Sequence, residues 1–387
     1  MTPLSFVFLG LSITSSWGNG HATTYRGLVR ELAARGHDVL FLERDAPWYA
    51  AHRDFARPPF ARVELYDGTD DLAARFRGDV ERADVVIVGS YVPDGAAVGR
   101  WVQRVARGRT AFYDIDTPVT LRKLAAGDAE YIARDLVGRY DVYLSFTGGP
   151  TLSRIVREHG AKAARALYCS VDPELYFPED RPRAIDLGYL GTYSRDRQRA
   201  LDALLVEPAR RLPDARFVVA GAQYPREVAW PPNVARIEHV PPGEHRAFYN
   251  AQRFTLNVTR ADMVRAGFSP SVRLFEAAAC GTPIITDTWP GLDDVFVTSG
   301  AAREILVARG AGDTVALVRS LPDAERRAVA ARARRRVLAA HTAAHRAEEL
   351  ERIARALLDA SSARAARRPA AGRMPLLENN PDQGGMA

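Results

Sequence analysis

The chain has 387 residues, of which 47% are hydrophobic and 26% are charged. This composition is typical of a globular protein with two or three domains. The net charge is +6, and the segment from Asp323 to Arg368 accounts for all of it, with twelve arginines against six acidic residues. The rest of the chain is close to neutral, so the sequence does not indicate a general nucleic-acid-binding surface.

Solvated helix faces explain this arginine-rich segment, and the alternative is peripheral contact of the basic C-terminal helices with an anionic membrane. The two cysteines, Cys169 and Cys280, are far apart in apolar surroundings. They indicate neither a disulfide framework nor a cysteine metal site, so we expect a cytoplasmic protein. The N-terminal run LSFVFLGL lacks a basic flank and favours a first β-strand over a signal peptide.

The N-terminal part alternates between apolar strands and helices. A strand at 4–11, a glycine-bearing loop at 12–21, a helix at about 23–35 and a strand at 38–42 form a βαβ unit, which requires parallel strands. The loop glycines do not fit the dinucleotide fingerprint G-x-G-x-x-G. The alternation continues with strands at 84–88, 111–115 and 142–146 and a helix at 96–107.

A second α/β series follows a proline-bearing, charged segment. This segment predicts a linker at 171–183, between an N-terminal domain (1–170) and a C-terminal domain with terminal helices (184–360). Residues 361–387 are rich in Ala, Arg, Pro and Gly, so we expect a disordered tail. The predicted fold class is α/β, with two doubly wound Rossmann-like domains facing a central cleft.

Ligands bind at the carboxyl ends of strands in such domains, so the cleft is the expected site. The loops around Gly20, Arg195, Arg260 and Ser269 all follow predicted strands and face this cleft.

The stretch from Phe268 to Asp287, FSPSVRLFEAAACGTPIITD, predicts a helix followed by a buried strand. Ser269 is its expected N-cap, with Pro270 at the first helical position. Arg273 and Glu276 are three residues apart and share one side of the helix. An open helix N-terminus suits a phosphate and the carboxylate suits paired sugar hydroxyls. The alternative is a surface ion pair between Arg273 and Glu276.

Three stretches give the chain its resemblance to the GT-B glycosyltransferases: GHATTYRGLVRELAARGHDV, SVDPELYFP and SPSVRLFEAAACGTPIITD. Further strings resemble the CgeB-type branch of the group 1, or family 4-like, enzymes: FLERDAPWYA, YDIDTPVTL, LSFTGGP, DLGYLGTYSRDRQ, VAGAQYP and FTLNVTRADM. The similarity spans about residues 4–308.

The resemblance implies a hexosyltransferase-like glycosyltransferase that binds a nucleotide sugar in its C-terminal domain and an acceptor mainly in its N-terminal domain. Glu276 would hold the ribose. The family's E-x7-E motif has Phe268 at its first position here, so any sugar contact of that glutamate must come from elsewhere. Retention of anomeric configuration is the expectation. The alternatives are a sugar-nucleotide epimerase of the same fold and a non-catalytic surface-assembly protein.

The remaining expectations concern individual side chains. Cationic side chains and helix N-termini can stabilise charge on the departing diphosphate without a metal, so we expect neither a metal nor a cofactor. The expected donor-binding residues besides Glu276 are Gly20, Arg195, Arg260, Arg265, Ser269, Ser271 and Arg273. His21 is the candidate general base, with a backbone or phosphate contact as its alternative. Asp116, in the D-x-D formed with Asp114, is expected to contact the acceptor or cap a helix rather than bind a metal. The sugar, base and acceptor are not identified by the sequence.

Overall fold

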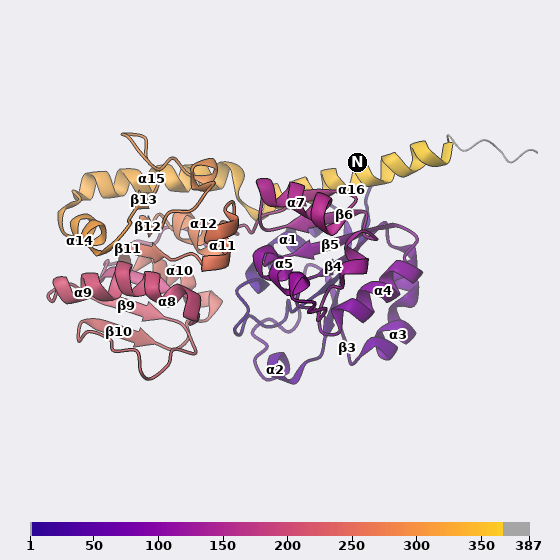
Figure 1. Cartoon of the computed structure of the whole chain (residues 1–387), viewed down its shortest axis with the longest axis horizontal. Helices are drawn as coiled ribbons and strands as arrows, with labels where there is room; N and C mark the ends of the chain where they lie inside the picture. Colours follow the sequence, from indigo (N-terminus) through magenta and orange to yellow (C-terminus); the bar gives the residue numbers. More distant parts are fainter. Residues whose placement is uncertain (1, 367–387) are drawn as a thin grey trace, which may run out of the picture.

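A computed structural model of the chain describes residues 2–366, which form two α/β domains and a long C-terminal helix (Figure 1). The N-terminal domain has a seven-stranded parallel sheet in the order β3 (Arg62–Tyr66), β2 (Asp38–Arg44), β1 (Ser5–Gly10), β4 (Val85–Gly89), β5 (Arg109–Asp114), β6 (Val142–Ser145) and β7 (Ala164–Ala166). Its helices are α1 (Ala22–Ala34), α2 (Pro47–Ala50), α3 (Thr69–Arg82), α4 (Gly95–Val105), α5 (Thr117–Ala125), α6 (Arg134–Val137) and α7 (Pro150–His159).

The C-terminal domain has a six-stranded parallel sheet in the order β10 (Val234–Ile237), β9 (Phe217–Ala220), β8 (Ile185–Leu190), β11 (Gln252–Asn257), β12 (Ile284–Thr286) and β13 (Leu306–Val307). The helical segments that follow β8 are α8 (Arg195–Leu201), the π-helix η1 (Asp202–Val206), α9 (Glu207–Arg211), α10 (Pro242–Asn250), α11 (Ala261–Ala266), α12 (Val272–Ala279), α13 (Leu292–Val295), α14 (Ala311–Ser320), α15 (Asp323–Ala340) and α16 (Ala343–Ala366). The predicted linker at 171–183 falls between β7 and β8.

Continuous apolar runs produce these sheets, because a parallel strand is covered by helices on both faces. All five residues of β4 are buried, and β1 pairs with β2 and β4 in parallel register. One hydrophobic cluster joins side chains of both domains, from Phe6 in β1 to Leu274 in α12 and Ala347 in α16. The predicted doubly wound architecture is therefore confirmed, with a core that continues across the domain boundary.

Each sheet reverses its strand order at one point, between β1 and β4 in the first and between β8 and β11 in the second. A crevice opens at the carboxyl ends of such strands, since the flanking connections leave in opposite directions. The loops after β1 and β8 therefore lie at the two places where a doubly wound sheet binds a ligand.

The last two helices connect the domains. Helix α15 packs against α12, whereas α16 packs against α1 of the N-terminal domain. Gly27 allows this contact, because a Cβ there would lie 2.9 Å from Cβ of Ala343. The backbone N–H of Val171 donates to the carbonyl of His341 at 3.1 Å, and the N–H of Ala343 donates to the carbonyl of Val171 at 2.8 Å. The two places where the chain passes between domains are therefore neighbours.

Across residues 2–366 no helix combines the length and apolarity that a bilayer crossing needs. The tail predicted at 361–387 lies outside the described residues, apart from 361–366, which end α16.

Candidate functional site

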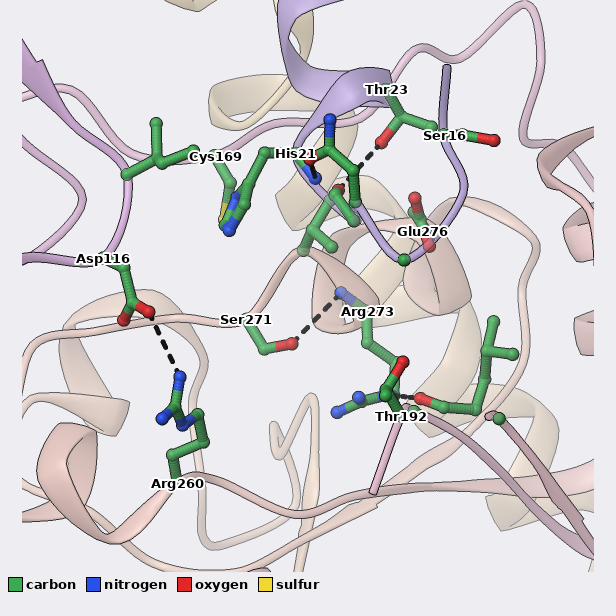
Figure 2. A pocket seen from close by; sticks show the side chains of 18 of the residues that line it. Ser16, His21, Thr23, Asp116, Cys169, Thr192, Arg260, Ser271, Arg273 and Glu276 are labelled. Atoms are coloured by element: carbon green, nitrogen blue, oxygen red, sulfur yellow. Dashed lines mark hydrogen bonds and ion pairs between the residues drawn. The ribbon is translucent and has the colours of Figure 1, made fainter. Parts of the chain in front are cut away.

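A cavity of about 670 Å³ lies between the two domains, at the carboxyl ends of both sheets (Figure 2). The N-terminal domain contributes the loop after β1, Trp48 of α2 and the segments after β5 and β6. The C-terminal domain contributes the segments after β8, β9, β10 and β11, one side of α10 and the first turns of α12. Eight predicted site residues line this cavity: Gly20, His21, Asp116, Arg260, Ser269, Ser271, Arg273 and Glu276.

Helix α12 begins later than the sequence predicted. The N-cap is Ser271, whose hydroxyl accepts a hydrogen bond from the N–H of Arg273 at 3.4 Å, and the helix starts at Val272. The assignment of Ser269 as N-cap and of Pro270 as first helical residue was wrong. The hydroxyl of Ser269 instead shares a hydrogen bond with Thr147 of the N-terminal domain, and a residue before proline favours extended backbone.

Glu276 and Arg273 are both buried, with 3% and 8% of their surface exposed. Glu276 accepts a hydrogen bond from the Tyr249 hydroxyl at 3.0 Å. Arg273 donates from Nε to the carbonyl of Leu190 at 2.6 Å and from Nη1 to Oδ1 of Asn257 at 2.7 Å. The surface ion-pair alternative is wrong, since each side chain is buried and holds a different partner.

Arg273 and Arg197 bring two positive charges to the cavity. Arg197 donates to the carbonyl of Thr192 at 2.6 Å, while its enclosed Nε has no hydrogen bond in the described part of the chain. The ion pairs found within residues 2–366 give neither arginine a carboxylate partner. Arg273 is buried and Arg197 is half-buried. An enclosed cation without a counter-charge is unfavourable, so this pair of guanidinium groups is suited to an anionic ligand.

Two predicted arginines do not line the cavity. Arg195 is the exposed first residue of α8, and Arg265 is exposed and forms an ion pair with Asp262 on its own helix. Arg197 was missed, although the sequence contained a signal for it. It lies four residues before the buried Leu201, so both residues share the inward face of the helix.

Asp116 and Arg260 close one side of the cavity with contacts between domains. Oδ2 of Asp116 accepts a hydrogen bond from the Tyr91 hydroxyl at 2.7 Å and lies 3.1 Å from Nη1 of Arg260 (Figure 2). Arg260 also lies 3.6 Å from Asp196. Its charge is thus shared between two carboxylates, whereas Oδ1 of Asp116 has no hydrogen-bond partner in residues 2–366.

His21 follows Gly20 at the start of α1 and contacts the ring of Phe146 edge-on. Burial lowers the pKa of His21 below its ordinary value; the nearby Asp116 raises that pKa and Arg260 lowers it, both more weakly. The imidazole is therefore neutral at pH 7 and can accept a proton or a hydrogen bond. A Cβ placed on Gly20 would have no other atom within 4 Å, so the backbone there faces open space.

The two carboxylates of the D-x-D pair have different surroundings. Asp114 is fully buried, does not line the cavity, and accepts hydrogen bonds from Tyr143 and from Thr120, the latter at 2.7 Å. Burial raises the pKa of Asp114 to about 6, although hydrogen bonds from Tyr143, Thr120 and the Asp116 N–H oppose that rise. Within the described chain, no group of three His, Cys, Asp or Glu side chains could hold a metal ion.

Phe268, which replaces an expected glutamate, lies in the contact between domains. Its φ is 50°, and a Cβ at Gly149 or Gly291 would lie 2.4 Å from its ring. Its carbonyl accepts a hydrogen bond from the N–H of Gly148 at 2.9 Å. The residue packs the domains together and does not line the cavity.

Comparisons with known proteins agree with this architecture. Residues 197–352 match the family model described as glycosyl transferase-like. The D-inositol 3-phosphate glycosyltransferase of Mycobacterium sp. (strain KMS) is 27% identical over 311 residues, covering 70% of this chain and 67% of that protein.

Two solved structures are similar in fold. Sucrose-phosphate synthase from Thermosynechococcus elongatus superposes with a TM-score of 0.65 at 17% identity, covering 92% of this chain and 100% of that one. Anabaena HepE in complex with UDP-glucose gives a TM-score of 0.65 at 10% identity, covering 93% and 100%. The chain therefore has the predicted GT-B architecture, with two parallel-sheet Rossmann-like domains.

Proposed function

We propose that this chain is a glycosyltransferase of the hexosyltransferase class, which moves a sugar from a nucleotide-sugar donor to an acceptor. The family match and the mycobacterial relative support the transferase activity, and the UDP-glucose complex of HepE supports the type of donor. The observation that carries the proposal is the C-terminal wall of the cavity, where Arg197, Arg273 and Glu276 converge.

The donor lies along this wall. Its diphosphate is bound by Arg197, Arg273 and the N-terminus of α12. Glu276 accepts hydrogen bonds from the ribose hydroxyls, oriented by the Tyr249 hydroxyl. The sugar then points toward His21 and Asp116 on the opposite wall.

In the transfer, an acceptor hydroxyl oxygen bonds to the anomeric carbon while the bond from that carbon to the diphosphate oxygen breaks. The electron pair of the broken bond stays on the diphosphate, where the two arginines stabilise it without a metal. The acceptor proton passes to the departing diphosphate oxygen on the same face, which gives retention. If His21 took this proton from the opposite face, the product would be inverted, so the anomeric configuration of the product distinguishes the two routes.

The chain is further proposed to belong to the CgeB-type branch, on the strings shared with it, and to act in the cytoplasm without a cofactor. The two buried cysteines, Cys169 and Cys280, support a reducing compartment.

The test is a donor panel. UDP, GDP, ADP and TDP are each added to the purified protein at millimolar concentration, and the melting temperature is measured. The bound nucleotide is expected to stabilise the protein by about 2.7 kcal/mol at a hundredfold excess over its Kd. An unchanged melting temperature with all four nucleotides would contradict the donor site. Interconversion of a nucleotide sugar without an acceptor would favour the epimerase.

The Glu276→Ala variant tests the orientation of the donor. Loss of its hydrogen bonds to the ribose is expected to weaken donor binding by roughly tenfold or more. Circular dichroism checks that the variant is folded. Unchanged donor affinity in a folded variant would overturn the role of Glu276.

A further inference from the structure

The two walls of the cavity differ in charge. The acceptor wall consists of the lining residues of the N-terminal domain: residues 16–21, Thr23, Trp48, the segments 115–118 and 146–147, and Cys169. Within the described chain, the acceptor wall has no lysine or arginine, and Asp116 is its one acidic residue. The opposite wall contributes Arg197, Arg260 and Arg273 together with the acidic Glu238 and Glu276. Arg260 is paired with Asp116 and Asp196, so the cations available to an anionic group are Arg197 and Arg273, both on the C-terminal wall.

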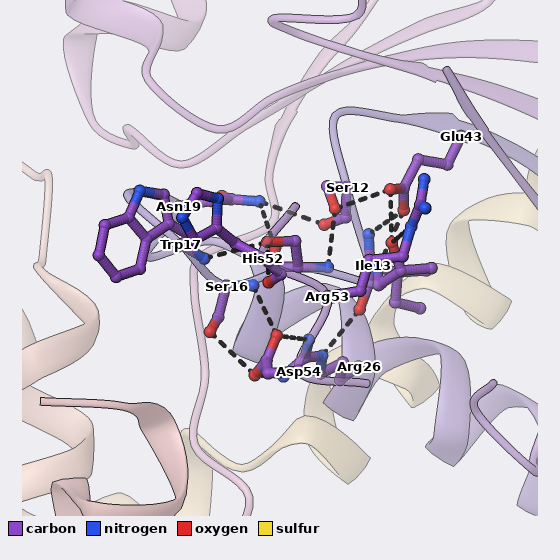
Figure 3. Close-up of polar contacts among 12 residues, drawn as sticks. Ser12, Ile13, Ser16, Trp17, Asn19, Arg26, Glu43, His52, Arg53 and Asp54 are labelled. Atoms are coloured by element: carbon purple, nitrogen blue, oxygen red, sulfur yellow. Dashed lines mark hydrogen bonds and ion pairs between the residues drawn. The ribbon is translucent and has the colours of Figure 1, made fainter. Parts of the chain in front are cut away.

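The arginines behind the acceptor wall already have hydrogen-bond partners (Figure 3). Arg26 forms two hydrogen bonds with the carboxylate of Asp54, at 2.9 and 3.0 Å, and a third with the carbonyl of Ile13. Arg53 pairs with Asp45 at 2.6 Å and donates to Thr14. Each guanidinium group therefore already has a carboxylate that neutralises its charge.

An exposed aromatic ring stands at the edge of the same wall. Trp48 is 56% exposed, the largest exposed fraction among the large apolar side chains of the described chain. The ring of Trp48 makes a tilted contact with His52, with the ring centroids 6.1 Å apart. Trp17 is more enclosed, because it stacks on His52 with a centroid distance of 4.4 Å and also contacts His239 of the C-terminal domain at 4.5 Å. An open tryptophan face beside a polar cavity suits the apolar face of a sugar ring.

The acceptor wall also has an unsatisfied hydrogen-bond acceptor. Asp116 is 5% exposed, and its Oδ1 has no partner among residues 2–366 although Oδ2 has two. An enclosed carboxylate oxygen without a donor is unfavourable, and a ligand hydroxyl would satisfy it.

We infer that the acceptor is an uncharged polyhydroxyl compound, a sugar or glycoside, and not a phosphorylated one. It stacks on Trp48 and donates a hydroxyl hydrogen bond to Oδ1 of Asp116. This acceptor class rests on the proposed transferase function, and it differs from the phosphorylated compound in the name of the mycobacterial relative.

The experiment uses the full chain and the nucleotide sugar whose nucleotide stabilises it best. Release of the nucleoside diphosphate is measured with methyl glucoside, maltose and myo-inositol, with glucose 6-phosphate and myo-inositol 3-phosphate, and with glucosamine. The uncharged compounds are expected to give the highest kcat/KM. A higher value for a phosphorylated or amino compound, or no response to any uncharged one, would overturn the inference. Donor binding in the same samples shows whether the proposed function has failed instead.

Two variants sharpen the test. Trp48→Ala is expected to raise the acceptor KM by about three- to tenfold and to leave the donor KM unchanged. Leu175→Ala, which removes another exposed apolar side chain outside the cavity, is its matched control. Thr23→Arg adds a cation to the acceptor wall and is expected to raise kcat/KM for phosphorylated compounds relative to uncharged ones. An unchanged acceptor KM in Trp48→Ala would contradict the stacking.

Discussion

Arg197 and Arg195 are two residues apart on α8, yet they have opposite surroundings. Arg197 lines the cavity with an unpartnered Nε, while Arg195 is exposed outside it. Loss of a charged hydrogen bond costs about 1.5–3 kcal/mol, which is tenfold or more in affinity. Arg197→Ala should therefore weaken nucleoside diphosphate binding by roughly tenfold or more, as measured by calorimetry.

Arg195→Ala is the matched control, since it removes the same charge from the same helix. Its expected effect on affinity is less than about twofold, because an exposed cation is screened by solvent and salt. Equal losses in the two variants would mean that only the general positive potential matters.

Asp114 should make stability depend on pH. Its pKa is raised by burial from 3.8 to about 6, so the folded state binds this proton more tightly than the unfolded state. The contribution of Asp114 to stability therefore falls as pH rises from about 4 to about 6, by about 3 kcal/mol, and is constant above.

The Asp114→Asn variant isolates this effect, because the amide resembles the protonated carboxyl and every other titrating group is unchanged. Urea unfolding at several pH values should show that the wild type loses stability relative to the variant as pH rises from about 4 to about 6. A difference that is independent of pH would contradict the assignment.

At the scale of elements, α16 docks on the N-terminal domain through Glu351. Its carboxylate, 4% exposed, lies 2.7 Å from Arg35, 2.8 Å from Arg355 and 3.4 Å from His37. Glu351→Gln removes the negative charge that pairs with Arg35 and Arg355. It is expected to cost about 1–3 kcal/mol in the free energy of unfolding. Glu348→Gln, at an exposed position of the same helix, should change stability by less than about 0.5 kcal/mol. Thermal and urea unfolding of both variants give the comparison.

Elements with a strong local pattern could be predicted from the sequence. The first predicted helix, at about 23–35, corresponds to α1 (Ala22–Ala34), and the predicted strand at 142–146 to β6 (Val142–Ser145). The N-cap of α12 was misassigned because Ser269 and Ser271 are equally good caps, and the choice depends on Thr147, a residue 122 positions away. The docking of α16 on α1 is likewise a long-range contact that no local pattern encodes.

The candidate site was likewise predictable where a local sequence pattern determines it. Strand ends and helix spacing identified the residues that follow β1, β11 and the start of α12. Sequence spacing alone could not show that Arg265 already pairs with Asp262, so Arg265 was chosen. Arg197 was overlooked although its spacing from Leu201 was a usable signal. Charge neutralisation by Asp262, Asp116 and Asp196 is a property of the folded chain.

At the scale of the whole molecule, the proposed transfer relies on arginines and a helix terminus for the charge of the leaving group. Activity should therefore survive EDTA with little change in kcat, measured as release of nucleoside diphosphate. Loss of activity under chelation, with recovery on adding manganese or magnesium, would contradict metal independence and return attention to the D-x-D of Asp114 and Asp116.

The return of α16 to the N-terminal domain has a consequence for biosynthesis. The ribosome makes α1 long before α16. Arg35 at the end of α1 and its partner Glu351 in α16 are 316 residues apart, so one face of α1 stays uncovered while these residues are translated. Domains generally fold in the order in which they emerge. Here the first domain to emerge is completed last, and an exposed apolar surface on the nascent chain is a natural binding site for a chaperone.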